Sequence, residues 1–417
     1  MCAAVHALVP LLLAAVGGHA AAAPQAPPQD GGVPRILIDD RLQERAVTLV
    51  SLDAGQVRYV DAGGLFRDEP QSAYVAIVPP PGAAPPNPPL PALWLTDGQR
   101  LAGILRPGDA PDDAALWKHP VFGAVSLPLD QVARVVLRRV AARSAARPPG
   151  DAEDSILLVN GDRLNGFVAA FGMIVRVEVG GEAREVSSRR IAQADLANPS
   201  EPLAGLTAWL SDGSIVRVAS FRTSRAGEVT ITPAFIPPEP AGGPHTLATG
   251  EAADAGRYSL ADIAAVAFDA ARIVPLGAIE SIAQTPVGDR RWTEPARRGP
   301  GDAAVLGAAD IVLPGPMTVE WALPAGAARV SAEAELTPEL WSWGDCEVVV
   351  SVVTSRGRAV ELLRERVHAE RPRLAINVPV AEPGGRLRLT IEPGRYGAIQ
   401  DRITLRRPII LLDAPPG

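Results

Sequence analysis

The chain has 417 residues, with 40 Lys and Arg residues against 47 Asp and Glu residues and a formal net charge of −7. Lys118 is the single lysine, and the arginines are interleaved with acidic residues, so no basic stripe is available to bind nucleic acid. The 42 prolines and 39 glycines disfavour long helices and favour strands joined by turns. The length allows two to four small domains.

The N-terminus has the order of regions that is typical of a secretory signal peptide, which we predict over residues 1–22. An apolar stretch at 7–16 precedes small residues that include Ala20 and Ala22. The stretch is too short to span a bilayer, which takes ~20 apolar residues. A disordered Ala-rich terminus is the alternative, because the usual basic start is missing. We therefore expect an exported protein, periplasmic or extracellular, without a transmembrane segment in the mature chain.

Only two cysteines occur, and Cys2 would leave with the signal peptide. Cys346 then stands alone, so the mature chain has no partner for an intrachain disulfide. Cys346 begins an apolar run, residues 346–350, that reads as a buried strand. A packed core thiol is favoured over a reactive nucleophile, because buried free cysteines mostly pack.

Internal similarity organises the middle of the chain. Segments 95–103, 158–166 and 210–216 each place Asp-Gly or Asn-Gly between two apolar alternating runs, at Asp97, Asn160 and Asp212. Such a pair is a strong hairpin signal, because the turn needs positive φ at its centre. Turn chemistry explains these recurring polar residues fully, so they indicate structure and not catalysis.

Each of these segments has a matching second half, at 130–137, 189–196 and 261–268. Apolar residues correspond between the copies: Val132 with Ile191 and Ile263, and Leu137 with Leu196 and Phe268. A short helical turn followed by a closing strand would place them on one side.

Small units of this kind resemble the SH3-like or Sm-like β-barrel repeats of exported bacterial proteins. We predict β-barrel repeats at 92–140, 155–198 and 205–285, the last with a Pro/Gly-rich insertion, and a divergent N-terminal β unit at 34–78.

From residue 303 onward the predicted strands are longer and alternate cleanly, which is typical of a jelly-roll β-sandwich. Here the chain resembles the NPCBM type of carbohydrate-binding module, which is found appended to glycoside hydrolases, including those of family 98. The resemblance rests on residues 315–324, 328–336, 344–350, 387–391 and 397–402. It implies a galactose-binding-like sandwich over 286–417 and contact with sugar. The family's tryptophan after the aspartate that matches Asp401 is absent.

No signature of an enzyme is present. The sequence lacks a phosphate loop ending in Lys, a G-x-S-x-G elbow and an H-E-x-x-H pair. A Ser-His-Asp group assembled in space stays open. Glu333 and Glu335 lie two apart on a predicted strand, and a solvated strand face is favoured there over a catalytic pair. We expect no enzymatic activity and no cofactor.

Aromatic residues supply the candidate ligand site. Trp341 and Trp343 point the same way in an extended segment, and aromatic faces beside Asp or Arg suit sugar rings. Core packing is the competing interpretation for them, as it is for Trp117. A cation at Asp345 or Asp401 has no acidic loop to support it, so no metal is predicted. The candidate carbohydrate-binding residues are Trp341, Trp343, Asp345, Arg395, Tyr396 and Asp401.

These observations predict an exported, non-catalytic binding protein whose C-terminal sandwich contacts carbohydrate, a polysaccharide or other glycan. The alternative is a structural or assembly protein of the bacterial cell envelope, whose repeats contact other envelope proteins or copies of themselves, because exposed strand edges favour such contacts. A hydrolase with an unrecognised site is a third hypothesis.

Overall fold

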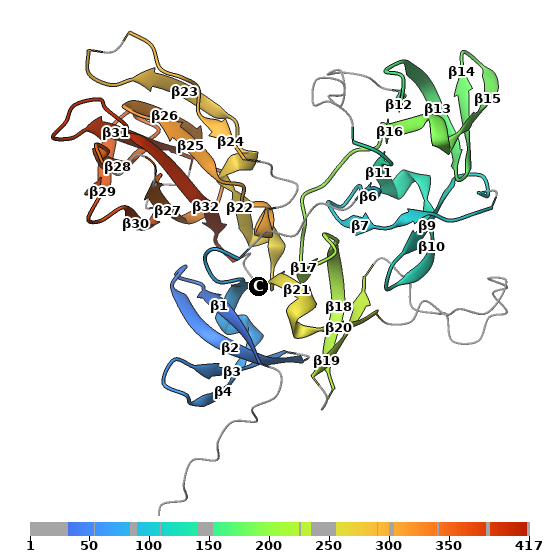
Figure 1. Cartoon of the computed structure of the whole chain (residues 1–417), viewed down its shortest axis with the longest axis horizontal. Coiled ribbons are helices and arrows are strands. Elements are labelled where there is room, and N and C mark those ends of the chain that lie inside the picture. The colour runs from blue at the N-terminus through green and yellow to red at the C-terminus, as the bar shows by residue number, and fades with distance from the viewer. Residues whose placement is uncertain are drawn as a thin grey trace, which may run out of the picture.

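The computed structural model describes residues 32–53, 55–83, 90–108, 110–139, 153–224, 227–234, 256–289, 291–299, 304–337, 339, 342–380 and 384–414. The regular elements of these ranges are β-strands and short 3₁₀ helices, and the predicted all-β fold class is confirmed (Figure 1). The predicted signal peptide lies outside the described residues. None of the helices in the described ranges has the length and apolar character needed to cross a membrane.

Four β units of one topology precede the C-terminal sandwich. In each, the first strand pairs antiparallel with both the second and the last strand, and a 3₁₀ helix leads into the last strand. Unit 1 contains β1 (Val33–Asp39), β2 (Glu44–Asp53), β3 (Gln56–Asp61), β4 (Phe66–Pro70), η1 (Gln71–Ala73) and β5 (Tyr74–Val78). Unit 2 contains β6 (Ala92–Leu95), β7 (Arg100–Ala102), β8 (Ile104–Leu105), β9 (Ala114–His119), β10 (Gly123–Pro128), η2 (Leu129–Gln131) and β11 (Val132–Val136).

Units 3 and 4 repeat this order. Unit 3 contains β12 (Asp154–Leu158), β13 (Arg163–Phe171), β14 (Ile174–Val179), β15 (Glu182–Ser187), η3 (Ser188–Arg190) and β16 (Ile191–Asp195). Unit 4 contains β17 (Thr207–Leu210), β18 (Ile215–Thr223), β19 (Glu228–Pro233), β20 (Gly256–Ser259), η4 (Leu260–Asp262) and β21 (Ile263–Ala267). The likeness of the units to SH3-like or Sm-like barrels stays a prediction.

The turn after the first strand sets a common register. Gly98, Gly161 and Gly213 occupy it with φ of 81°, 92° and 85°, a conformation that glycine adopts without a steric cost. Unit 1 has Leu42 at the same place, with φ of 55°. As aligned from the sequence, Val132, Ile191 and Ile263 each begin the last strand of their unit and are buried.

The units are joined through their strands. The last strands pair in twos, β5 with β21 and β11 with β16, and β7 pairs with β18. Their order in space is therefore unit 1, unit 4, unit 2, unit 3 (Figure 1). One hydrophobic cluster runs through all four units. Trp117 lies in it, fully buried, and donates to Ala102 O at 3.0 Å, so it packs, as favoured from the sequence.

Residues after unit 4 form a β-sandwich of two antiparallel sheets. One sheet has the order β24-β25-β32-β27-β30, with β22 also paired to β32, and the other has the order β23-β26-β31-β28-β29. The strands are β22 (Ile273–Pro275), β23 (Ser281–Pro286), β24 (Arg297–Arg298), β25 (Ile311–Pro314), β26 (Met317–Ala322), β27 (Ala327–Leu336), β28 (Asp345–Val353), β29 (Ala359–His368), β30 (Arg373–Pro379), β31 (Arg386–Pro393) and β32 (Arg402–Leu412). The short 3₁₀ helix η5 (Ala270–Arg272) precedes β22, and the 3₁₀ helices η6 (Leu276–Ala278) and η8 (Val305–Gly307) lie between the strands.

The sandwich begins earlier than the boundary predicted at residue 286. β22 and β23 pair with sandwich strands and not with unit 4. Cys346 is fully buried in the core between the sheets, where burial raises the pKa of its thiol. The core-thiol interpretation therefore agrees with the structure.

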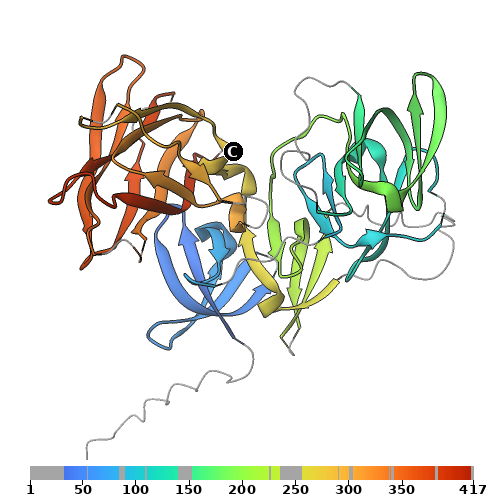
Figure 2. The same ribbon diagram turned by 45° about the horizontal axis from the view of Figure 1, so that its top comes forward.

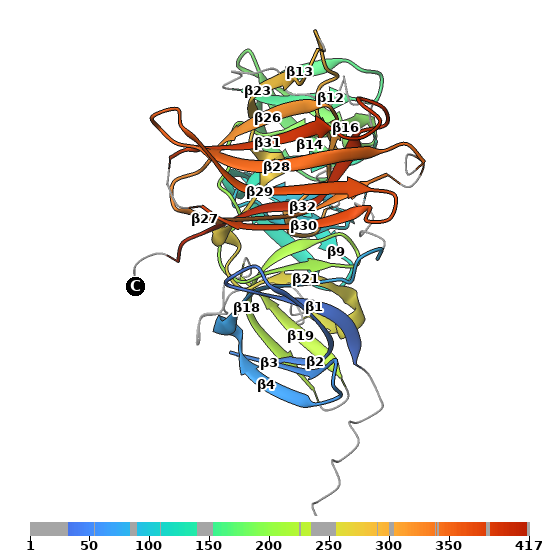
Figure 3. The same ribbon diagram turned by 90° about the vertical axis from the view of Figure 1, so that its left-hand side faces the viewer.

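The sandwich lies against unit 1 (Figures 2 and 3). Asn377 Nδ2 donates to the carbonyl oxygens of Arg41 and Leu42, each at 3.0 Å, and Arg407 forms an ion pair with Glu44 at 2.7 Å. The Leu42 side chain belongs to the same buried cluster as Ile409 and Leu411 of β32. The sandwich thus buries the Leu42 side chain of the unit 1 turn, while residues 40, 41, 43 and 44 stay exposed.

Candidate functional site

Two segments far apart in sequence meet at one end of the sandwich. β28 and β31 are neighbours in the five-stranded sheet, with Cys346 opposite Pro393. Gly394 follows β31 and donates to Asp345 O at 2.8 Å. A Cβ at residue 394 would lie 2.2 Å from that oxygen, so only glycine allows this approach. The sheet register therefore brings the 395–397 loop next to the residues just before β28.

The buried carboxylate of Asp345 binds the backbone of this loop. Its carboxylate accepts two hydrogen bonds from Arg366, Nε to Oδ1 and Nη2 to Oδ2, both at 2.5 Å, and one from the Arg395 backbone N–H at 2.9 Å. The bonds from Arg366 hold the pKa of Asp345 below its ordinary value, against the opposing effect of burial. The ionised, buried Asp345 is thus a positioning residue that fixes the backbone of Arg395.

The loop and the residues before β28 carry exposed aromatic side chains. The Trp343 and Tyr396 rings lie 5.6 Å apart, nearly perpendicular at 80°, and are 55% and 41% exposed. The Arg395 guanidinium lies 5.6 Å from the centre of the Tyr396 ring. Ile399, also exposed, follows in the same loop region. We name Trp343, Arg395 and Tyr396 the aromatic platform.

The structure brings four of the six predicted residues together: Trp343, Asp345, Arg395 and Tyr396. Asp401 is buried, at 2% exposure, and contributes to the interior of the sandwich end and not to its surface. Trp341 lies outside the described residues. Arg366 was missed from the sequence, where an arginine on an alternating strand looks like any solvated residue.

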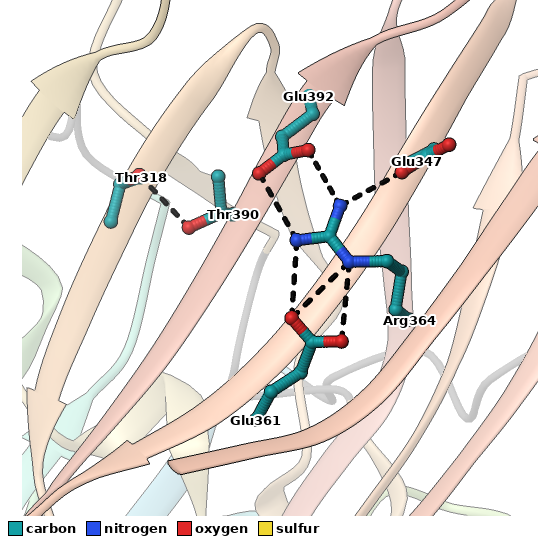
Figure 4. Close-up of polar contacts among 6 residues, drawn as sticks. All are labelled: Thr318, Glu347, Glu361, Arg364, Thr390 and Glu392. Carbon is teal, nitrogen blue, oxygen red and sulfur yellow. Dashed lines mark hydrogen bonds and ion pairs between the residues drawn. The ribbon is translucent and has the colours of Figure 1, made fainter. Parts of the chain in front are cut away.

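The outer face of the five-stranded sheet carries a second polar cluster (Figure 4). Arg364 donates to Glu347 at 2.8 Å and to Glu392 at 2.7 Å through Nη1, and to Glu361 at 3.2 Å through Nε. These bonds raise the pKa of Arg364. These charged groups are solvent-exposed, and their hydrogen bonds are made to one another. The face is therefore a solvated surface and a weak candidate for ligand binding.

Glu335 differs from its predicted role as a solvated residue. Glu333 is partly exposed, whereas Glu335 is buried and bridges Arg373 at 2.8 Å and Arg406 at 2.7 Å. Hydrogen bonds from these arginines lower the pKa of Glu335, against the opposing effect of burial. Both oxygens of Glu335 are held by cations, so this carboxylate is not placed as the acid of a hydrolase.

A histidine, a serine and an aspartate meet where unit 2 contacts unit 4. His119 Nε2 lies 2.9 Å from Ser214 Oγ and 3.4 Å from Asp212 Oδ2. Both contacts use the same nitrogen, because Nδ1 accepts the backbone N–H groups of Val121 and Phe122 at 3.1 Å. In a catalytic triad the aspartate binds the nitrogen opposite the serine. His119 and Ser214 are also fully buried, so this cluster joins two units and does not catalyse.

Within the described ranges, no three His, Cys, Asp or Glu residues group as metal ligands would. The oxygens of Asp345, one of the two aspartates considered for a cation, are already taken by Arg366 and Arg395.

Comparison with known proteins gives structural likenesses only. No protein family and no curated protein matches the chain. A CBM51 module of a Clostridium perfringens GH95, solved with methyl-galactose, is 11% identical over 33% of this chain and 99% of its own, with a TM-score of 0.26. The tandem CBM51 modules of a family 98 glycoside hydrolase from Streptococcus pneumoniae are 9% identical over 88% of this chain and 93% of theirs, with a TM-score of 0.26.

The CBM51-2 and INT domains of Clostridium perfringens ZmpB are 10% identical over 34% of this chain, with a TM-score of 0.27, and the chain spans about a third of that protein's length (31%). The solved structures that resemble this chain thus include carbohydrate-binding modules of the CBM51 type. Scores of this size assign neither a ligand nor a site, which have to come from the residues of this chain.

Proposed function

We propose that this protein binds carbohydrate, without catalysis, through the aromatic platform at the end of its sandwich. The exposed Trp343–Tyr396 pair carries the proposal. A pyranose ring has an apolar face that stacks on an indole and a rim of hydroxyls that takes hydrogen bonds. Trp343 supplies the face, Tyr396 OH and the Arg395 guanidinium supply polar groups, and Asp345 and Arg366 keep the loop ordered beforehand.

The loop that carries Arg395 and Tyr396 is already ordered before a sugar binds, and this is why we expect measurable affinity from a small surface. A loop that is already fixed by Asp345 loses little conformational entropy when a sugar binds. The rings of the platform are exposed, which suits one residue of a polysaccharide better than an enclosed small molecule.

The test is binding of the full chain to a panel of neutral and charged polysaccharides and glycans, measured by array and then by calorimetry. Trp343→Ala and Tyr396→Ala should each weaken the best interaction at least about tenfold, which is about 1.4 kcal/mol. Trp292→Ala is the matched control, because Trp292 is 72% exposed and lies outside the platform. Equal binding by Trp343→Ala and the unaltered chain would overturn the proposal, as would the absence of binding to every glycan.

Export of the protein is part of this proposal, since extracellular and envelope polysaccharides lie outside the cytoplasm. The signal-like residues 1–22 support it. N-terminal sequencing of the protein recovered from its native host tests export: a start after Ala20 or Ala22 agrees with it, and an intact Met1 on the cell-associated protein contradicts it.

Assembly in the cell envelope is a second candidate function, favoured by one observation. The four β units already bind one another through equivalent strands, so their edges are surfaces that recognise similar units.

A further inference from the structure

The contacts between the units repeat a two-fold relation. We number the last strand from its first residue: Val132 in unit 2, Ile191 in unit 3, Ile263 in unit 4 and Tyr74 in unit 1. In the contact of units 2 and 3, the fourth residues of the two last strands pair with each other, Val135 with Ala194. The contact of units 4 and 1 has the same register, Val266 opposite Ile77.

Backbone hydrogen bonds follow the same symmetry. Leu137 N donates to Ala192 O and Leu196 N donates to Ala133 O, so position six donates to position two in both directions. Phe268 N donates to Val75 O in the other contact. The fourth donor of the set would be residue 79, which is a proline without an N–H.

The contact of units 2 and 4 is two-fold as well, but through the second strands. Arg100 pairs with Ile215, and each is the second residue after the turn glycine of its unit. In each unit, the residue directly after the turn glycine accepts a hydrogen bond from a backbone N–H of the other unit. Gln99 Oε1 accepts from Arg217 N at 2.6 Å, and Ser214 Oγ accepts from Ala102 N at 2.9 Å.

The units therefore form a row in which contacts alternate: last strands between 1 and 4, second strands between 4 and 2, and last strands between 2 and 3. At each end of the row, the first residues of one second strand pair with no other unit in the described part of the chain. At unit 1 the sandwich contacts the turn, through Asn377 on the carbonyls of Arg41 and Leu42 and Arg407 on Glu44, while residues 43–46 stay exposed. At unit 3, in the described part of the chain, residues 163–165 pair only with β12 of their own unit.

The exposure of unit 3 agrees with a missing neighbour. Leu101 and Val216 are fully buried at the unit 2–unit 4 contact, whereas the equivalent Leu164 is partly exposed. The turn residues 159–162 are all exposed, and Val159 among them is a large apolar side chain. Asp162 stands where Gln99 and Ser214 stand, and it too carries a side-chain oxygen that can accept an N–H.

We propose that unit 3 binds unit 3 of a second copy of this chain, second strand to second strand, around a two-fold axis at Arg163. Asp162 of each copy then accepts the Asn165 N–H of the other, as Gln99 and Ser214 do between units 4 and 2. The surface is self-complementary, which a symmetric contact requires. Arg163 Nη1 donates to Ser155 Oγ of its own unit at 3.2 Å, which draws the two like charges away from the axis.

This inference deepens the second candidate function, assembly, and does not depend on sugar binding. Sedimentation equilibrium of the full chain over concentrations up to roughly 100 µM is the first measurement. We expect a monomer–dimer equilibrium. Asp162→Lys, which removes the acceptor and adds two cations near the axis, should weaken dimerisation at least tenfold. Asp162→Ser, which installs the residue of unit 4, should leave it within threefold of the original.

Glu182→Lys is the charge-matched control, because Glu182 is exposed on β15 of the same unit, away from the turn. Circular dichroism of each variant checks that it is folded, and hydrogen exchange should show the Asn165 amide protected in the dimer alone. A monomer at all concentrations overturns both this inference and self-assembly. A dimer that Asp162→Lys leaves intact, or that fails to protect Asn165, overturns this surface while self-assembly stands.

Discussion

The last-strand and second-strand contacts between the β units differ in their chemistry. The last-strand contacts, such as β11 with β16, are backbone ladders flanked by buried apolar residues, including Val135 and Ala194, and here also by the ion pair of Arg134 with the buried Asp195. The contact of units 2 and 4 has one strand pairing between the second strands and an aromatic contact of Phe122 with Tyr258. It also includes four buried polar side chains: His119, Ser214, Gln99 and Arg100. The backbone bonds of a ladder do not titrate, whereas a buried polar contact such as that of His119 depends on every partner being present and correctly protonated.

The largest loss of stability is expected when a charged residue is placed in the β11–β16 pairing. Val135→Asp places a carboxylate without a partner at the axis of the unit 2–unit 3 contact, so it should lower the free energy of unfolding by about 4 kcal/mol or more. Urea denaturation followed by circular dichroism measures it. Ile104→Asp, at a half-exposed position of unit 2, is the control and should change stability little. Similar losses for both variants would contradict the difference between buried and exposed sites.

Acid should act selectively on the polar contact. Burial lowers the pKa of His119 to about 4, against the opposing charge of Asp212, while the unfolded chain titrates near 6.5. The unfolded state binds the extra proton between these values, so stability is complete above pH 6.5 and falls as the pH drops toward 4, by about 3 kcal/mol in total. Denaturation midpoints from pH 7 to 4 give the slope. The same slope in His119→Asn would assign it to other groups.

Removing one acceptor should have a smaller effect. Ser214→Ala takes the acceptor away from both the Ala102 N–H and His119 Nε2, which remain buried, and should cost about 2 kcal/mol. Thermal and urea unfolding measure the loss. Ser211→Ala, at an exposed turn position of the same unit, provides the comparison. Equal stability of the two variants would show that the hydroxyl is not needed at the contact.

The smallest effect is expected at the rim of the same contact. Arg217 and Asp97 form an ion pair at 3.6 Å with side chains 42% and 29% exposed. Water and salt screen such pairs, so Arg217→Ala should change stability by less than about 1 kcal/mol, and less still at high salt. The backbone N–H that binds Gln99 is unchanged by this substitution. A loss as large as that of Ser214→Ala would mean that rim charges, and not the buried hydroxyl, hold the units together.

The sequence predicted the elements of the units well because their signals are local. Asp-Gly and Asn-Gly turns and apolar alternation depend on residues a few positions apart, and Gly98, Gly161 and Gly213 have the positive φ that those turns need. The unit 1 turn was harder to recognise, since Leu42 stands in place of the glycine. The start of the sandwich was placed too late because β22 and β23 are recognised as sandwich strands only by their partners.

The sites depend on long-range neighbours, which a single sequence does not reveal. Trp343 and Tyr396 were both candidates from composition, but their edge-to-face contact follows from the pairing of β28 with β31. Nothing near Arg366 in the sequence marks it as the partner of Asp345. His119 and Ser214 are 95 residues apart and meet only because two units share a second-strand contact. Their burial then decides against catalysis, a distinction that spacing alone could not draw.

Leu42 has a consequence for the size of any assembly. Its side chain is buried with Ile409 and Leu411 of the sandwich where the other units have a glycine, so this position of unit 1 is taken up within the chain. Residues 43–46 of unit 1 stay exposed, whereas the contact that we propose for unit 3 would use the same surface of both copies and would therefore close at two copies. The pair would carry its two sandwiches at opposite extremities. If the aromatic platform binds sugar as we propose, such a dimer would contact a long polysaccharide at two points and would bind it more tightly than a single sugar.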